Sequence, residues 1–286
     1  MIHSMTGFGK ASLQLPTKKI TVEIKSLNSK GLDLNTRMPS VFREMELGLR
    51  NQISQRLERG KVDFSLYVEV TGEETTSKIN VPIVKGYINQ MKAVIPNADE
   101  TELMKMAVRM PDALKTERDE IDENEWKQIQ TVIDEALENI ANFRKDEGAS
   151  LEKEFQLRIG NINNLMTEAV SYDAERVETV KTRLRTALDE LKVNVDENRF
   201  EQELIFYLEK YDITEEKVRL GNHLNYFLET LNGTEANGRK LGFITQEMGR
   251  EINTMGSKSN HTEMQKLVVM MKDELEKIKE QVLNVL

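Results

Sequence analysis

Two glutamates, Glu247 and Glu251, stand four residues apart in a helix-favouring segment, residues 238–258. Side chains at this spacing share a helix face, where two negative charges repel unless a cation lies between them. Arg250 could be that cation. Mg²⁺ or Mn²⁺ could also fill the role, because such ions take carboxylate and water oxygens and assist phosphodiester hydrolysis. Two glutamates on one helix are common, so the spacing alone does not identify a metal site.

A second group of polar residues lies on the preceding predicted helix. His223 follows Arg219 by one turn, and histidine is a residue type that can bind a metal or transfer a proton. A histidine beside an apolar helix face is more often packed and hydrogen-bonded. Glu215 precedes Arg219 by one turn, and an ordinary surface ion pair explains those two residues. A mechanism with two histidines would require His223 to meet His3 or His261.

Basic residues and glycines flank these carboxylates. Arg239, Lys240 and Lys258 could clamp phosphate oxygens, and the glycines near both ends of the segment could let a backbone approach a phosphate. The other interpretation is that these glycines terminate helices. No Walker loop, dinucleotide fingerprint, zinc-finger spacing or nucleophile-elbow serine occurs, so the common nucleotide, redox and acyl-transfer classes gain no support.

Helices must position these residues. The predicted buried stripe of the 238–258 helix is Leu241, Ile244, Met248 and Ile252. The helix before it, expected from near Asp212, has the apolar residues Val218, Leu220, Leu224, Phe227, Leu228 and Leu231. The last helix repeats apolar residues at alternating four- and three-residue steps: Met264, Val268, Met271, Leu275, Ile278, Val282 and Val285. Such a heptad seam requires a partner, either in the chain's own bundle or in another subunit.

The middle of the chain is long, charged and helix-favouring from about Glu125. Its two apolar stripes are Phe155, Ile159, Ile162, Met166 and Ala169, then Val177, Val180, Leu184, Leu188 and Leu191. We expect a bend near residues 171–173 that produces a helical hairpin, each arm burying its stripe against the other. Before it, residues 82–115 are predicted to form short helices because Pro96 and Pro111 interrupt them.

The amino-terminal part alternates apolar and polar residues in two stretches, 19–27 and 62–70, which predicts two half-buried strands. Between them, Phe42, Met45, Leu49, Ile53 and Leu57 predict an amphipathic helix that ends before Gly60. The expected fold is α+β, mainly α. It has an amino-terminal domain (1–120) with an antiparallel sheet covered by helices, a long helical hairpin (121–200) and a carboxy-terminal helical bundle (201–286) that carries the candidate site. Residues 72–76 would form an exposed linker.

Composition narrows the classes of protein further. The 286 residues contain no cysteine, which excludes disulfides, thiolate zinc sites and cysteine nucleophiles. The start lacks a signal-peptide pattern, and no apolar run is long enough for a membrane span, so we expect an unexported, cytoplasmic protein. The net charge is −9, yet residues 1–71 carry 11 basic and 7 acidic residues. This asymmetry does not by itself identify a partner.

Several motifs together resemble the YicC/YloC family. They are Ser4-Met5-Thr6-Gly7-Phe8-Gly9, Arg59-Gly60-Lys61-Val62, Asp212-Ile213-Thr214-Glu215-Glu216, Gly238-Arg239-Lys240-Leu241, Gln246-Glu247-Met248 and Glu276-Lys277-Ile278-Lys279-Glu280-Gln281-Val282. The resemblance implies an endoribonuclease that depends on Mn²⁺ or Mg²⁺, works as a homo-oligomer, a ring-like hexamer, cleaves RNA and takes part in small-RNA turnover. Residues 72–203 contribute little to this resemblance.

The family pattern also implies roles for individual residues. The catalytic group would be His223, Glu247 and Glu251, and the metal ligands would be Glu216, His223, Glu247 and Glu251. RNA phosphates would be held by Arg219, Arg239, Lys240, Arg250 and Lys258. This chain departs from the pattern at Lys10, Lys30 and Gly31, where the family commonly has arginine, arginine and an aromatic residue. An aromatic base contact at Gly31 is therefore absent.

Two other functions fit the same residues. One is a non-catalytic oligomeric RNA-binding or adaptor protein that presents RNA to another nuclease. The other is a purely structural helical protein without a nucleic-acid partner, which salt-dependent RNA binding would contradict.

Overall fold

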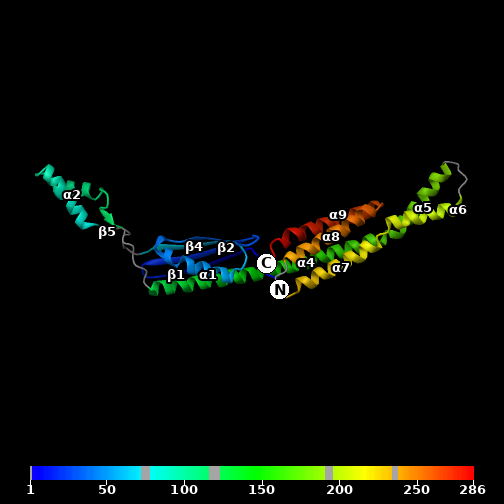
Figure 1. The fold of residues 1–286 in the computed structure, drawn as a ribbon, viewed down its shortest axis with the longest axis horizontal. Coiled ribbons are helices and arrows are strands. Elements are labelled where there is room, and N and C mark those ends of the chain that lie inside the picture. The colour runs from blue at the N-terminus through cyan, green and yellow to red at the C-terminus, as the bar shows by residue number, and fades with distance from the viewer. Residues whose placement is uncertain (1, 72–77, 116–122, 191–195, 234–237) are drawn as a thin grey trace.

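A computed structural model describes residues 2–71, 78–115, 123–190, 196–233 and 238–286. The molecule is elongated: a small unit with α2 lies at one end, followed by the amino-terminal sheet, the carboxy-terminal helices and the α5–α6 arm (Figure 1). The long helix α4, Glu123–Ser171, runs beside both the sheet and the carboxy-terminal helices. This arrangement confirms the α+β, mainly α, prediction. None of the helices in the described part of the chain has the apolar length needed to cross a bilayer.

Four strands form the amino-terminal sheet in the order β1-β2-β4-β3. Their bounds are Gly7–Gln14 for β1, Lys18–Leu27 for β2, Leu32–Arg37 for β3 and Gly60–Val70 for β4. β2 and β4 are the two predicted strands and pair antiparallel, whereas β3 pairs with β4 in parallel, so the sheet is mixed. β1 was not predicted as a strand. Its Gly9 lies so close to α4 that a Cβ there would collide with the backbone of Ala136.

One face of this sheet is buried. Ile20, Val22 and Ile24 of β2 and Val62, Phe64 and Leu66 of β4 form this core together with residues of α1 and the first half of α4. The predicted helix after Pro39 begins as a 3₁₀ turn, Ser40–Met45, and continues as α1, Glu46–Arg56. Phe42, Leu49, Ile53 and Leu57 are buried as expected. Val70 is 46% exposed, because the alternation no longer meets a covering helix at the end of β4.

The predicted hairpin at residues 171–173 is wrong. α5, Asp173–Glu190, follows α4 after a single non-helical residue, Tyr172, and continues away from the body (Figure 1). The 155–169 stripe is instead buried against the carboxy-terminal helices. Val177 and Val180 of α5 lie against α6, Glu197–Tyr211, with Tyr207 and Tyr211. The periodicity identified both stripes, but it could not tell which helix covers each one. Leu191 lies outside the described residues.

Residues 78–115 form a small separate unit. It contains α2, Val81–Val94, and α3, Glu100–Ala107, together with the two-residue strands β5, Lys78–Ile79, and β6, Leu114–Lys115. Val84, Ala107 and Ala113 form its buried cluster, and Leu103 of α3 is also buried. The two short helices agree with the prediction, and the expected linker at residues 72–76 lies outside the described residues.

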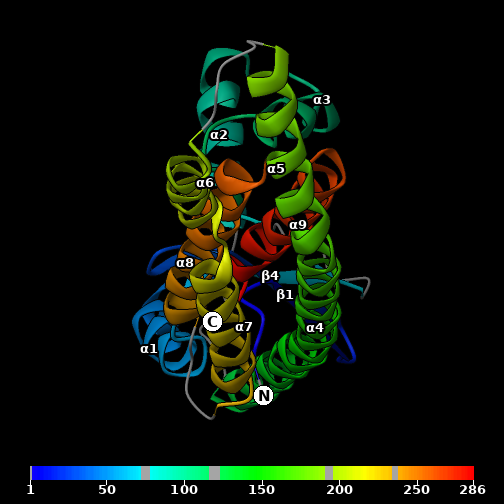
Figure 2. The ribbon, with the colours of Figure 1, turned by 90° about the vertical axis from the view of Figure 1, so that its right-hand side faces the viewer.

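The carboxy-terminal bundle consists of the second half of α4 with α7, Thr214–Leu231, α8, Gly238–Lys258, and α9, Thr262–Val282 (Figure 2). The whole predicted stripe of α8 is buried. The heptad seam of α9 is buried against α4 and α8, so its partner is in the same chain. Val218 is 56% exposed, because it lies on the side of α7 away from this core.

Both chain ends meet where the sheet and the bundle join. Ser4 pairs with Val285 in a β-bridge, and the Met5 amide donates to the Asn284 carbonyl at 2.7 Å. The buried Arg144 of α4 donates from Nη2 to the Met5 and Arg59 carbonyls and to Ser26 Oγ. The amino-terminal motif therefore joins the two halves of the molecule rather than forming a site of its own.

Candidate functional site

The predicted site residues lie along the seam between α7 and α8, which pack side by side (Figure 2). Two contacts fix the register of these antiparallel helices. At one end, the Lys240 ammonium lies 4.8 Å from the Tyr226 ring centroid, and at the other, Lys258 Nζ lies 2.8 Å from Glu216 Oε1. The turn of α7 that carries His223 lies between these contacts and therefore faces the middle of α8.

The same register sets the two glutamates of α8 in that middle part. Seven residues separate Lys240 from Glu247, which is about 10 Å along the helix axis, and Glu251 follows one turn later. Counted along the helices from the two end contacts, His223 of α7 falls near the level of Glu247, and Arg219 falls one turn further, toward Glu251. This register assigns His223, Glu247 and Glu251 to the same stretch of the helix pair, and no contact among the described residues joins the three side chains to one another.

The carboxylates on the seam differ in exposure. Glu216 and Glu251 are each only 5% exposed, whereas Glu247 is exposed. Glu216 Oε1 accepts the hydrogen bond from Lys258, but the buried Oε2 has no hydrogen-bond partner. The Glu251 carboxylate makes no hydrogen bond or ion pair with any other residue in the described ranges. Buried carboxylate oxygens without donors are costly unless a cation or donor reaches them.

Three of the five predicted RNA-binding cations are paired with glutamates. Arg219 Nη2 lies 2.5 Å from Glu215 Oε1, which confirms the predicted surface ion pair. Arg250 Nη1 lies 4.0 Å from Glu247 Oε2. These pairs are exposed, so each contributes little to stability and can exchange its partner for a phosphate. The third is the Lys258–Glu216 pair, which is largely buried.

Arg239 and Lys240 differ from these three cations. Both are exposed, and neither is paired with a carboxylate in the part of the chain that the structure describes. They lie at the amino end of α8, where the helix dipole adds to their positive charge. They are therefore the cations most available to an anionic ligand.

His223 is half-buried, and no hydrogen bond links it to another described residue. His261 lies elsewhere: its ring stacks on Tyr172 with 5.2 Å between centroids, and its Nδ1 accepts from the Met264 amide at the start of α9. The described contacts join His223 to neither His3 nor His261, so they provide no two-histidine arrangement.

Metal binding by the seam has one feature in its favour and one limit. Within the described residues of this single chain, no three histidine, aspartate or glutamate side chains converge closely enough to hold an ion. Mg²⁺, however, is commonly held by one or two carboxylates together with water and substrate phosphate oxygens. The unpartnered Glu216 Oε2 and the buried Glu251 fit a site of that kind, and they do not form a complete cage by themselves.

The structure corrects both interpretations of the glycines of α8. Gly242, Gly249 and Gly256 lie inside the helix, and a Cβ on them would contact Val282, Leu275 and Val268 of α9. At the start of α8, a Cβ on Gly238 would collide with the Val285 carbonyl. These glycines let α8 approach α9 and the carboxy-terminal tail, so they neither cradle a phosphate nor end the helix.

Asp212 lies between α6 and α7 and begins the acidic run of the family motif. Its carboxylate accepts hydrogen bonds from the Thr214 hydroxyl at 2.7 Å and the Thr214 amide at 3.0 Å. These bonds lower the pKa of Asp212 below its ordinary value. Asp212 therefore satisfies the backbone amide of Thr214, the first residue of α7, and helps to set the orientation of the helix that carries Glu216 and His223.

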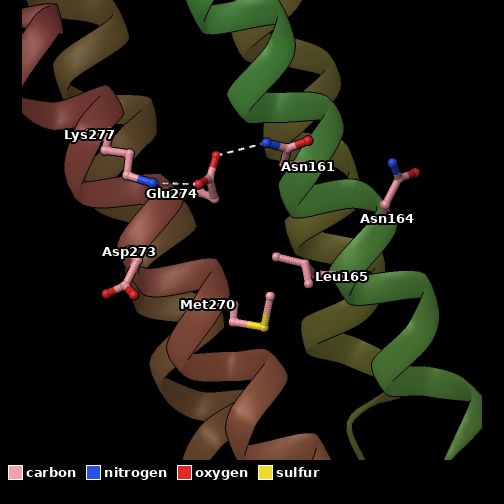
Figure 3. Close-up of a pocket in the computed structure, with 7 residues that line it drawn as sticks. All are labelled: Asn161, Asn164, Leu165, Met270, Asp273, Glu274 and Lys277. Carbon is pink, nitrogen blue, oxygen red and sulfur yellow. Dashed lines mark hydrogen bonds and ion pairs between the residues drawn. The ribbon is translucent and has the colours of Figure 1, made fainter.

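A surface groove of about 420 Å³ lies between α4 and α9, away from the seam (Figure 3). Glu274 is held there by Lys277 at 2.7 Å, Asn161 at 2.9 Å and Arg158 at 3.3 Å. Burial alone would raise the pKa of Glu274, but these hydrogen bonds outweigh it and lower the pKa from 4.5 to about 2. The groove joins α4 to α9 and contains none of the predicted site residues.

Sequence reasoning overlooked two aromatic residues beside the predicted cations. Tyr226 and Phe243 are 44% and 61% exposed. Both fall outside the apolar stripes of their helices, and this position in the sequence pattern could have identified them. A large aromatic residue on the polar face of an amphipathic helix is not used for core packing.

The fold and the seam define an elongated, mainly helical protein with carboxylates and cations aligned along one helix pair. Comparison with known proteins identifies the family. Residues 2–153 match the model for Endoribonuclease YicC-like, N-terminal region, and residues 169–286 match Endoribonuclease YicC-like, C-terminal. The chain therefore belongs to the YicC-like family, as its motifs predicted.

Two curated relatives span essentially the same length. The chain is 33% identical over 293 residues to a protein of Clostridioides difficile named probable endoribonuclease YicC, and the match covers 100% of both. It is 29% identical over 287 residues to a protein of the same name from Haemophilus influenzae, covering 99% of each.

Proposed function

We propose that this protein is a divalent-metal-dependent endoribonuclease that cleaves RNA phosphodiester bonds at the α7–α8 seam. The observation that carries the proposal is the pair of buried carboxylates, Glu216 and Glu251, on a seam flanked by exposed cations, in a chain whose relatives are named probable endoribonucleases.

The chain's own residues would divide the work as follows. Arg239, Lys240 and Arg250 hold phosphate oxygens and fix the register of the RNA along the seam. His223, which is half-buried and free of hydrogen-bond partners among the described residues, moves a proton at the reacting oxygen. One or two of the carboxylates of Glu216, Glu247 and Glu251 would hold Mn²⁺ or Mg²⁺, with water and RNA phosphate oxygens as the other ligands and His223 nearby. When bound, the ion would activate water and offset negative charge on the phosphate.

We also propose that the protein acts in the cytoplasm, in small-RNA turnover, as a homo-oligomer, with six copies expected from the family resemblance. Assembly would help the site, because one chain alone lacks a three-ligand cluster among its described residues. Light scattering coupled to gel filtration measures the number of copies.

Incubation of the purified protein with RNA and Mn²⁺ tests the nuclease proposal. We expect internal cleavage that EDTA abolishes and that Glu247→Gln or Glu251→Gln lowers by at least about 100-fold, comparable to losing a charge stabiliser. Glu135→Gln, an exposed glutamate of α4, is the matched control and should cleave like the wild type. Activity that survives EDTA and both seam substitutions contradicts the proposed site.

The missing three-ligand cluster favours one other function, that of a non-catalytic RNA adaptor. An adaptor would bind RNA in a salt-dependent way, because cations on the seam would still displace counterions. It would leave the RNA intact at every metal concentration. The same incubation, read on a gel, separates the two functions.

A further inference from the structure

Two exposed aromatic rings lie at the amino end of the α7–α8 seam. Phe243 follows Arg239 by one turn and Lys240 by three residues, so all three lie on adjoining parts of the outer surface of α8. Tyr226, on α7, reaches this surface because the Lys240 ammonium lies over its ring, 4.8 Å from the centroid. Rings and cations are thus interleaved within about one helical turn of each helix.

The exposure of these rings has no explanation in the fold. Phe227, next to Tyr226, and Leu241, two residues before Phe243, are fully buried in the bundle core, whereas Tyr226 and Phe243 are exposed. In water, exposed rings add nothing to folding through burial. Rings beside unpaired cations are instead the usual means of binding single-stranded nucleic acid, since bases stack on the rings and cations meet the phosphates.

The charge around the rings favours the same ligand. Arg239 and Lys240 have no carboxylate partner in the described ranges, and Glu247, about 10 Å along α8 from Lys240, is paired with Arg250. A phosphate near the rings can therefore meet both cations, and the exposed carboxylate on this part of α7 is Glu229, three residues after Tyr226. A protein partner that covered the same rings would need acidic groups to match Arg239 and Lys240.

We infer that Tyr226 and Phe243 form a base-stacking subsite for single-stranded RNA, with Lys240 and Arg239 on the adjacent phosphates. This inference rests on the proposed function and extends it. The subsite lies on the same seam as Glu247, so the stacked base and the cleaved bond belong to nearby nucleotides. Bases within a duplex already stack on each other, so the subsite selects unpaired RNA.

Binding of two oligomers by the full-length protein tests the subsite. One is a short fluorescein-labelled oligoadenylate, and the other is an abasic ribose-phosphate oligomer of the same length and charge. EDTA is present throughout to prevent hydrolysis. Wild-type protein should bind the oligoadenylate about tenfold or more tightly than the abasic oligomer, because only the former can stack. Fluorescence anisotropy measures both affinities.

The double variant Tyr226→Ala/Phe243→Ala should lose this preference, so that the ratio of the two affinities falls to about one, while its affinity for the abasic oligomer is unchanged. Tyr226→Phe should retain the ratio. Arg239→Ala should weaken both oligomers equally. Phe143→Ala, which removes an exposed ring of α4, is the matched control and should behave like the wild type. A folding defect would instead weaken both oligomers.

Four results would overturn the inference. The first is an unchanged ratio in the double variant. The second is a change in its oligomeric state by light scattering, which would assign the rings to a contact between copies of the chain. The third is wild-type protein that binds neither oligomer, which would refute the proposed RNA function together with the subsite. RNA binding without base preference would refute the subsite alone.

Discussion

Lys258, the last residue of α8, donates a hydrogen bond to the buried carboxylate of Glu216 in the first turn of α7, with 2.8 Å between Nζ and Oε1. Both residues were predicted to act on metal or RNA. Their contact also fastens the two helices at one end of the seam. Glu216 is only 5% exposed, and Lys258 is its ion-pair partner among the described residues.

Removal of Lys258 should therefore destabilise the fold. Lys258→Ala leaves the Glu216 carboxylate buried and unpaired, and we expect the free energy of unfolding to fall by about 2–3 kcal/mol. Lys217→Ala, on the exposed side of α7, should change it by less than about 0.5 kcal/mol. Urea unfolding monitored by circular dichroism measures both. Equal stability of the two variants would show that Lys258 does not stabilise the seam.

Lys240 and Arg239 should contribute to RNA binding mainly through charge. If each meets one phosphate, Lys240→Ala should weaken binding similarly for all RNA sequences and reduce the slope of log affinity against log salt by about 1. Affinities measured at several salt concentrations give this slope. Lys266→Ala, an exposed lysine of α9 paired with Glu263, is the control and should leave the slope as it is. A slope that stays the same in Lys240→Ala contradicts a phosphate contact.

Substitution by alanine should have opposite effects on protein stability at two glycines of α4. A Cβ on Gly148 would collide with the backbone of Ile2, next to the strand that joins the chain ends, whereas a Cβ on Gly160 meets nothing within 4 Å. We expect Gly148→Ala to lower stability by about 2 kcal/mol or more. Gly160→Ala should raise it by about 0.5–1 kcal/mol through helix propensity. Thermal unfolding of the two variants measures the difference, and a stabilised Gly148→Ala would contradict the close packing.

The sequence predicted the features that depend on residue periodicity, namely which faces of the helices and strands are buried. The stripes of α8 and α9 and the strands β2 and β4 are buried where the pattern placed them, because a repeating apolar face must be covered. Periodicity does not specify the covering partner. For this reason the hairpin at residues 171–173 was wrong, and the 155–169 stripe packs against the carboxy-terminal helices instead.

The candidate site was predictable to the same extent. Spacing placed Glu247 and Glu251 on one face of a helix, but the burial of Glu251 depends on the neighbouring helix and could not be read from α8 alone. The glycines of α8 were misread because their role, close approach to α9, is a tertiary contact. The pairing of Lys258 with Glu216 spans 42 residues and gave no local signal.

The contacts of Glu274 in the α4–α9 groove predict a pH-dependent stability. Its pKa in the folded protein, about 2, lies below the ordinary value of 4.5, so the unfolded chain binds this proton more readily. The stabilisation is therefore complete above about pH 5.5 and is lost as the pH falls from 4.5 toward 2. We expect Glu274→Gln to lose about 1–2 kcal/mol at neutral pH, a value reduced for solvent screening. The difference from the wild type should shrink toward pH 2.

Asp273→Asn provides the control for this titration, because Asp273 lines the same groove and makes none of the contacts of Glu274 (Figure 3). It should follow the wild-type curve of unfolding free energy against pH. Urea unfolding at several pH values between about 2.5 and 7 gives the three curves. If Glu274→Gln runs parallel to the wild type over that whole range, the hydrogen bonds from Lys277, Asn161 and Arg158 do not hold the carboxylate in its charged form.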